Sequence, residues 1–336
     1  MTDKPQIDLL THSPVDMTNA GLAHIEQLKK FAHRVLPSCV PDLQGYFAPL
    51  TAGEVCVILA QTHNYKSGHM KAWERFATGY LRQHERQGEV VIHVDLESTL
   101  EGIALQELAI ESGYTVADLS SNQSLDWKRL MKAVKVINGV NIFTISHTLG
   151  DKKAPPLTMT NIYRCINHIE NTMHEHQNPI AAIFVDYLQA LPFDDEVAKK
   201  SQDYGRQKRL QVSADFDNCR ILARHFNCPV VVGVQAKQEL SCKPPLLIPA
   251  MYDGQETSFI AQRADAIISQ WMPKTTSNVG DWVNAPTIDF QVEEDDIFVK
   301  VLKRRGGHPS GMAIKNKIDY RSGNIIPDRI IRQVAL

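Results

Sequence analysis

The sequence predicts a doubly wound α/β domain, in which a mainly parallel sheet carries helices on both faces. Three observations support this prediction. Short, continuous runs of apolar residues alternate along the chain with segments of helical pattern. These runs lack the polar–apolar alternation of a half-exposed strand, which is typical of parallel strands buried on both faces. The length of 336 residues, 43% of them hydrophobic and 22% charged, suits one large domain of this kind.

The predicted elements follow one another in a regular order. Strands are expected at residues 54–60, 89–97, 140–146, 180–186, 229–235, 265–271 and 297–305, and helices at 68–87, 99–113, 160–177 and 207–227. Residues 311–326 have the pattern of a closing hairpin. An amphipathic helix is expected at 19–36, and Pro37 and Pro41 break the chain after it. We therefore expect an N-terminal helical extension at residues 1–42 and one large domain at residues 43–336.

The composition argues against several classes of protein. A formal net charge of −2 speaks against a globally basic nucleic-acid-binding protein, although a basic channel built locally or by oligomerisation stays open. The six cysteines are scattered without a C-x-x-C pair, and the sequence shows no secretory signal and no apolar run of membrane-spanning length. We expect reduced thiols, a cytoplasmic location and no membrane contact. A zinc site is not expected, because no Cys/His cluster has ligand spacing.

Polar residues stand at the ends of the predicted strands. In doubly wound sheets ligands bind at the carboxyl ends of the strands, so these residues are expected to gather at one edge. They are Lys66, Ser67, Glu97, Asp186, Gln235, Lys303 and Arg305.

The stretch GEVCVILAQTHNYKS, residues 53–67, has the order of a phosphate-binding loop: a strand, a polar loop, then Lys66 and Ser67 entering a helix. In such a loop the lysine contacts the β- and γ-phosphates and the hydroxyl binds Mg²⁺. The alternative is a solvated loop lysine. Tyr65 stands directly before the lysine, where the pattern requires glycine. It must either adopt a glycine-like backbone geometry or reshape the loop.

Two acidic residues and a glutamine complete the expected site. Asp186 ends an apolar run as a Walker B aspartate does and would hold Mg²⁺, unless it only caps the next turn. Glu97 would polarise the attacking water as a general base. Asp95 lies on the same strand face and is either a competing candidate or a partner for a basic side chain. Gln235 would sense the γ-phosphate, or else satisfy nearby backbone groups.

Basic residues occur in two further places. Lys303 and Arg305 would supply positive charge to phosphate in trans, or they belong to a solvated hairpin. A second cluster follows the Walker B strand and would contact nucleic-acid phosphates, or form a solvated helix and its entry loop. It includes Lys199, Lys200, Arg206, Lys208 and Arg209.

These motifs together resemble the C-terminal ATPase domain of DnaB-type replicative helicases, a RecA-like motor. The resemblance covers about residues 43–327 and includes, in order, VVIHVDLES, IFVDYLQAL, PVVVGVQ, DGQETSFIAQRADAIIS and VKVLKRRGGHPSGMA. It implies ATP and Mg²⁺ as cofactors, a homo-hexameric ring and single-stranded DNA in a central channel, with a loader or other protein as a further possible partner. It also implies that Lys303 and Arg305 reach the neighbouring subunit's γ-phosphate, and that Gln235 couples to DNA. The loop at residues 253–258, with Gln255 and Glu256, would face the channel.

The chain departs from the family pattern in three ways. Tyr65 replaces the glycine before the lysine, and the loop at 253–258 lacks the family's basic and glycine residues. Only a short N-terminal stretch stands where the family carries a helical domain. The sequence therefore leaves three functions open: a ring ATPase moving on single-stranded DNA, a nucleotide-gated or catalytically weak scaffold that assembles with DNA and proteins in a mobile-element or defence system, and a recombinase-like filament on DNA.

Overall fold

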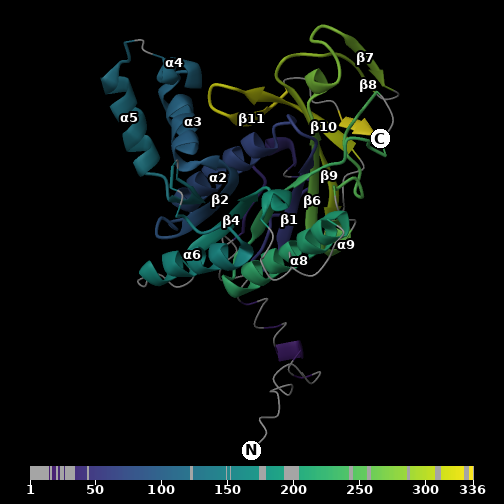
Figure 1. Ribbon diagram of the computed structural model, residues 1–336. Helices are drawn as coiled ribbons and strands as arrows, with labels where there is room; N and C mark the ends of the chain where they lie inside the picture. The colour runs from purple at the N-terminus through teal and green to yellow at the C-terminus, as the bar shows by residue number, and fades with distance from the viewer. Residues whose placement is uncertain are drawn as a thin grey trace, which may run out of the picture. The chain divides into compact units, whose positions relative to one another are not determined.

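The computed structural model describes most of the chain (Figure 1). Apart from a few isolated positions between residues 15 and 26, the described residues are 35–43, 45–121, 124–148, 150–151, 153–173, 179–192, 204–241, 245–255, 259–285, 288–306, 312–328 and 333–335. The helix expected at 19–36 lies largely outside them. The chain divides into a unit at Met1–Val35 and a second unit at Leu36–Leu336. This division lies near the expected boundary at residue 42, and the roles expected for the two parts stay predictions.

One large sheet forms the centre of the second unit, in the order β11-β10-β9-β6-β1-β5-β4-β2-β3, with β12 paired to β10. Its parallel strands are β1 (Val55–Ala60), β2 (Val90–Thr99), β3 (Ile142–His147), β4 (Ile180–Asp186), β5 (Val230–Gln235) and β6 (Ala266–Trp271). Antiparallel strands extend it: β9 (Asp296–Arg304), β10 (Met312–Asp319), β11 (Asn324–Pro327) and β12 (Gln333–Ala335). The mainly parallel sheet and the closing hairpin, β10–β11, are confirmed.

Helices cover both faces of this sheet. They are α2 (Lys66–Gln83), α3 (Leu100–Ser112), α6 (Met159–Thr172), α8 (Tyr204–His225) and α9 (Phe259–Arg263). The helices α4 (Val116–Ser120) and α5 (Trp127–Asn138) pack on α3 instead (Figure 1). Short 3-10 turns lie at η2 (Pro41–Leu43), η3 (Leu188–Ala190) and η4 (Pro273–Thr275). Figure 1 shows α6, α8 and α9 together on one side of the sheet, where they share one hydrophobic cluster.

The strand β1 shows why the sheet is buried on both faces. Val55, Val57 and Leu59 pack in the cluster with α6, α8 and α9, whereas Cys56 and Ile58 pack in the cluster with α2. Successive side chains of a strand point to opposite faces, so a strand covered on both faces needs apolar residues at every position. The continuous apolar runs of the sequence are therefore explained.

Several parts of the fold were not predicted from the sequence, the short elements α9 and β12 among them. The helices α4 and α5 follow α3, and the hairpin of β7 (Trp282–Ala285) and β8 (Ile288–Gln291) stands apart from the main sheet. α5 has clear local signals, since the Asp126 side chain accepts hydrogen bonds from the amides of Lys128 and Arg129, and Leu130 and Ala133 are buried.

Among the described residues, no helix is long and apolar enough to cross a membrane.

Candidate functional site

The loop between β1 and α2 is held in place by the buried side chain of Asn64. Its Oδ1 accepts hydrogen bonds from the amide of Met272 at 2.7 Å and the hydroxyl of Thr275 at 3.2 Å. Its backbone carbonyl accepts a third bond, from the Gln270 side chain at 2.5 Å. The loop is thereby tied to the end of β6, and α2 begins at Lys66 with its N-terminus directed at this loop. Unpaired amides at a helix N-terminus favour anions.

Tyr65 adopts the left-handed backbone geometry that glycine adopts without strain. Its φ is 59° and its ψ 25°, which costs a residue with a side chain about 1–3 kcal/mol. Of the two outcomes expected from the sequence, the structure thus shows the glycine-like one. The ring folds over Gly68 in the first turn of α2, where an added Cβ would lie 2.3 Å from Tyr65 Cε2.

The hydroxyl of Tyr65 links the phosphate loop to the turn between β10 and β11. It donates to the carbonyl oxygen of Gly323 at 2.9 Å, and the ring meets that of Tyr320 edge-on, with centroids 6.3 Å apart. Burial raises the pKa of Tyr65 to about 12, so this donor keeps its proton. The turn is therefore fastened to the first turn of α2 by the residue that departs from the phosphate-loop pattern.

Lys66, Asp186 and Glu97 come together at the carboxyl ends of β1, β4 and β2. The ammonium of Lys66 contacts the Asp186 carboxylate and lies 4.2 Å above the ring of Tyr187. Both members of the pair are largely buried, with 11% and 5% of their side chains exposed. The Tyr187 hydroxyl donates to Glu97, and burial together with this carboxylate raises the Tyr187 pKa. Ser67 lies half-buried in the first turn of α2, beside Lys66.

Gly233 in β5 leaves the room that the Lys66–Asp186 pair occupies. A Cβ at this position would lie 3.1 Å from Asp186 Oδ1, 3.1 Å from Met70 Sδ and 3.2 Å from Lys66 Cδ. Even alanine would be tight, and a branched side chain cannot be accommodated without moving these neighbours.

We expect Gly233→Val to lower the free energy of unfolding by about 1–3 kcal/mol through overpacking and to weaken nucleotide binding. Chemical denaturation and ligand titration measure the two effects. Gly79→Ala in α2 is the matched control, because an added Cβ there meets no atom within 4 Å. That control should stabilise the fold by about 1 kcal/mol, since alanine is the better helix former. Equal behaviour of the two variants would contradict the packing explanation.

Asp95 has a structural partner, which answers one question that the sequence left open. Its Oδ1 accepts hydrogen bonds from the amides of Glu97 at 3.0 Å and Ser98 at 2.7 Å. Its Oδ2 lies 3.6 Å from Nε2 of His93, whose Nδ1 lies 2.6 Å from the Glu74 carboxylate. Asp95 therefore pairs with a basic side chain and is itself buried, while Glu97 is exposed.

Gln235 contacts the phosphate loop on one side and a second loop on the other. Its Nε2 donates to the Thr62 hydroxyl at 2.7 Å, and its backbone carbonyl accepts from the Gln255 amide at 2.8 Å. Gln189 reinforces this connection: it accepts from the Gln235 amide at 3.2 Å and donates to the Gln255 carbonyl at 3.4 Å. A shift of Thr62 would thus reach Gln255 through short contacts.

The expectation that all strand-end residues gather at one edge is wrong for Lys303 and Arg305 within a single chain. β9 runs antiparallel to β6, with Ala266 opposite Arg304, so its carboxyl end lies at the amino ends of the parallel strands. Lys303 donates to the carbonyls of Ala261 and Gln262, at 2.9 Å each. Arg305 binds Asp265 at 2.8 Å, yet 58% of its side chain is exposed.

A cavity of about 660 Å³ adjoins the first turn of α2. Its lining combines aromatic rings with cations and includes Tyr65, Ser67, Lys71, Tyr114, Tyr320 and Arg321.

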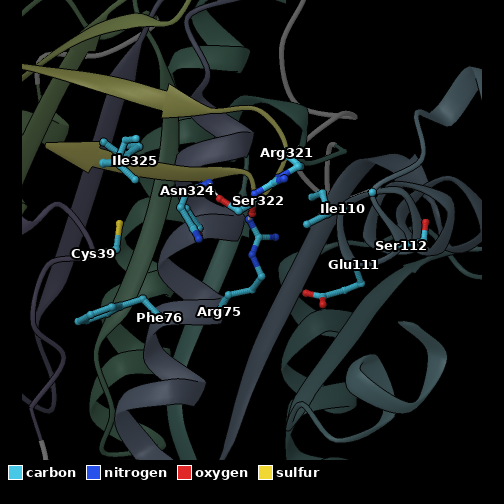
Figure 2. Close-up of a pocket in the computed structure, with 13 residues that line it drawn as sticks. Cys39, Arg75, Phe76, Ile110, Glu111, Ser112, Arg321, Ser322, Asn324 and Ile325 are labelled. Carbon is cyan, nitrogen blue, oxygen red and sulfur yellow. Dashed lines mark hydrogen bonds between the residues drawn. The ribbon is translucent and has the colours of Figure 1, made fainter. Parts of the chain in front are cut away.

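Figure 2 shows a neighbouring cavity of about 620 Å³, between α2, α3 and the β10–β11 turn. There Arg75 points from α2 towards the turn and donates to the carbonyls of Ser322 and Gly323, at 3.2 Å each. Gly323 O therefore accepts from both Tyr65 and Arg75.

Several expected residues lie outside the described part of the chain. These are Lys199, Lys200 and Glu256, together with the side chain of Arg206.

Three residues that the structure brings to the site were not predicted from the sequence. Tyr187 directly follows Asp186, the predicted Walker B aspartate, and this position in the sequence could have marked it as a site residue. Thr62 and Gln189 lie within quoted motifs, but their contacts join positions far apart in the chain.

Comparison with known proteins identifies the family of this chain. A family model described as the DnaB-like helicase C terminal domain matches residues 36–320. The replicative DNA helicase DnaB of Mycoplasma genitalium is 22% identical over 272 residues, which are 80% of this chain and 51% of that protein. The chain therefore spans about half the length of this relative.

Solved structures show the same fold. One solved ATPase domain superimposes with a TM-score of 0.67 at 16% identity, covering 93% of this chain and 99% of that one. A DnaB-like replicative helicase, described with its interactions with primase, gives a TM-score of 0.66 at 16% identity, covering 88% of this chain and 63% of that one. These likenesses confirm the expected RecA-like fold. With the family model matching most of the sequence, the chain belongs to the family of DnaB-like helicase C-terminal domains.

Proposed function

We propose that this chain binds ATP with Mg²⁺ at the loop before α2 and uses ATP hydrolysis to move along single-stranded DNA as part of a homo-hexameric ring. The observation that supports this most is the meeting of Lys66, Asp186 and Glu97 at the carboxyl ends of β1, β4 and β2, which all belong to the parallel part of the sheet. Doubly wound sheets bind their ligands at this edge. Membership of a helicase family supports the same function.

The donors at this edge fit Mg²⁺ and a triphosphate. Mg²⁺ prefers oxygen ligands, and the Ser67 hydroxyl and the Asp186 carboxylate would hold it. When bound, the ion neutralises charge on the β- and γ-phosphates. Lys66 would contact these phosphates, and the amides of the first turn of α2 would contact them from the loop. The left-handed Tyr65 places the loop backbone as the missing glycine would.

Glu97 is our proposed general base for hydrolysis. It lies at the end of β2 and accepts a hydrogen bond from Tyr187, whose ring also contacts the Lys66 ammonium. This arrangement keeps the carboxylate beside the lysine that would hold the γ-phosphate, where it can orient a water molecule for in-line attack. The cavity of about 660 Å³ beside Ser67 is large enough for the base and ribose, and its tyrosines offer stacking surfaces.

Coupling to DNA would run from Thr62 through Gln235 to the loop that carries Gln255 and Glu256.

Arg305 is our proposed residue for contact with the γ-phosphate bound to the neighbouring copy, because it is exposed and far from its own chain's phosphate loop. Lys303 is the weaker candidate, since two backbone carbonyls of its own chain already accept hydrogen bonds from its ammonium.

Lys199, Lys200 and Arg206 remain our proposed contacts to nucleic-acid phosphates. A protein partner is also proposed, as one relative is known with its interactions with primase.

We expect ATP turnover by the purified chain to rise several-fold on addition of single-stranded DNA, and this stimulation to weaken as salt is increased. Release of inorganic phosphate, with and without an oligonucleotide, measures it. Turnover that stays absent in both conditions, with DNA and nucleotide still bound, would support the catalytically weak scaffold instead. Electron microscopy of the assembled particle separates a closed ring from a filament or a monomer.

A further inference from the structure

Three buried ionisable side chains form a chain of contacts beneath the end of β2. Glu74 lies in α2, and His93 and Asp95 lie in β2, with 3%, 2% and 4% of each residue exposed. Nδ1 of His93 is 2.6 Å from the Glu74 carboxylate, whereas Nε2 lies 3.6 Å from the Asp95 carboxylate, an ion-pair distance beyond the length of a hydrogen bond. We call these residues the Glu74–His93–Asp95 network. Asp95 lies opposite Asp186 in the pairing of β2 with β4, but among the described residues no side-chain hydrogen bond or ion pair joins the network to Lys66 or Asp186.

The charges around His93 make it an imidazolium. Burial alone would lower its pKa, but the flanking carboxylates outweigh this effect and raise the pKa to about 10. Burial raises the pKa of Glu74, opposed by the attraction of His93. Two cations and two further carboxylates line a small cavity with Glu74 and His93: Lys71, Arg75, Glu107 and Glu111. Two buried carboxylates around one cation are costly to desolvate, so such a network calls for an explanation beyond stability.

The network ends on the backbone that carries the proposed general base. Regular pairing of β2 with β4 ends at Asp95, and pairing of β2 with β3 is interrupted between Val94 and Thr99. Glu97 therefore lies where neither neighbouring strand sets the backbone. The amides of Glu97 and Ser98 instead donate to Asp95 Oδ1. The position of the Asp95 carboxylate consequently sets the backbone conformation at Glu97, and with it the direction in which the Glu97 side chain points.

We propose that His93 is a positioning residue for the general base: held by Glu74, it fixes the Asp95 carboxylate, and Asp95 fixes the backbone of Glu97. The other end of the network lies on α2, the helix that begins at Lys66. The network therefore joins the helix that would carry the phosphates to the strand end that carries the base, and holds the two in register. This inference rests on the proposed function of Glu97.

Two substitutions of His93 separate its two contacts. Asparagine places an amide near the position of Nδ1, so His93→Asn keeps a donor for Glu74 and loses the contact with Asp95. Glutamine reaches the position of Nε2, so His93→Gln keeps an N–H group that faces Asp95. Both variants remove the buried imidazolium, so a loss of general stability affects both.

We expect His93→Asn to lower kcat for ATP by about 10- to 100-fold, because a small misplacement of a catalytic group has effects of this size, and to leave KM within twofold. His93→Gln should retain most of kcat. Hydrogen exchange at the Glu97 and Ser98 amides gives a readout that needs no hydrolysis. It should be about tenfold faster in His93→Asn and near wild type in His93→Gln, with the β5 amides unchanged in both.

Equal exchange and equal kcat in the two variants would overturn the positioning role, as would losses that only follow the change in global stability. If the wild-type chain does not hydrolyse ATP, the proposed function fails, but the exchange rates still decide whether His93 orders this backbone. Should His93→Asn not fold, Asp95→Asn takes its place. It removes the charge that attracts His93 and the two amides, so unchanged exchange at Glu97 and Ser98 would overturn the proposal.

Discussion

Replacement of Lys66 by methionine is expected to weaken ATP binding by about 10- to 100-fold, since hydrogen bonds to charged groups contribute about 1.5–3 kcal/mol. Turnover should fall by at least about 100-fold, because the ammonium also stabilises charge that develops in the transition state. Lys66 meets Asp186 at the carboxyl ends of β1 and β4, and no other lysine in the described residues has this position. Titration with a fluorescent nucleotide and phosphate release measure the two effects.

Stability must be separated from function in this experiment. Removing Lys66 leaves the buried Asp186 carboxylate without its cation, which costs about 3–5 kcal/mol for a buried pair. The double variant Lys66→Met/Asp186→Asn removes both charges and should recover much of that stability while still failing to bind ATP. Lys132→Ala is the control for a general loss of positive charge, because Lys132 is exposed on α5. ATP affinity near wild type in the double variant would refute the assignment of this site.

Replacement of Tyr65 by glycine is expected to raise ATP turnover by about tenfold or more. Glycine relieves the left-handed strain of about 1–3 kcal/mol and removes the ring from above Gly68. The amides of this first helical turn are then open to phosphate, and the loop no longer has to break the hydrogen bond with Gly323. Steady-state kinetics over a range of ATP concentrations will show whether KM, kcat or both change.

Tyr65→Phe separates the effect of the Tyr65 ring on ATP turnover from the effect of its hydroxyl. It keeps the ring over Gly68 and the backbone strain but removes the hydroxyl that donates to Gly323. If the ring is the obstacle, the phenylalanine variant stays close to wild type. If the link to the β10–β11 turn is the obstacle, its turnover rises towards that of the glycine variant. A fall in turnover with Tyr65→Gly would show that tyrosine assists the site, contrary to our account.

Much of the sheet could be predicted because its signals are local. The strands β1, β4 and β5 are continuous apolar runs, and each ends in a polar loop or residue that the carboxyl edge of a parallel sheet brings towards the others. That rule failed for Lys303 and Arg305, since it holds only for parallel strands. Nothing local in residues 297–305 states that β9 pairs antiparallel with β6.

The parts that escaped prediction depend on contacts between distant positions. Glu74 in α2 and His93 in β2 have ordinary neighbours in sequence, and only the packing of α2 on the sheet joins them. Tyr65 was recognised as a departure, yet its hydrogen bond to Gly323 spans 258 positions and has no sequence signal. The positive φ of Tyr65, by contrast, follows from the steric needs of the phosphate loop and was one of two stated outcomes.

The most direct test of the account is an experimental structure of the chain with a non-hydrolysable ATP analogue and Mg²⁺. We predict density for the triphosphate at the first turn of α2, with Lys66 at the phosphates, Ser67 and Asp186 at the ion, and the ring of Tyr65 displaced from above Gly68. Density at another place, or an unchanged Lys66–Asp186 pair at saturating nucleotide, would contradict it.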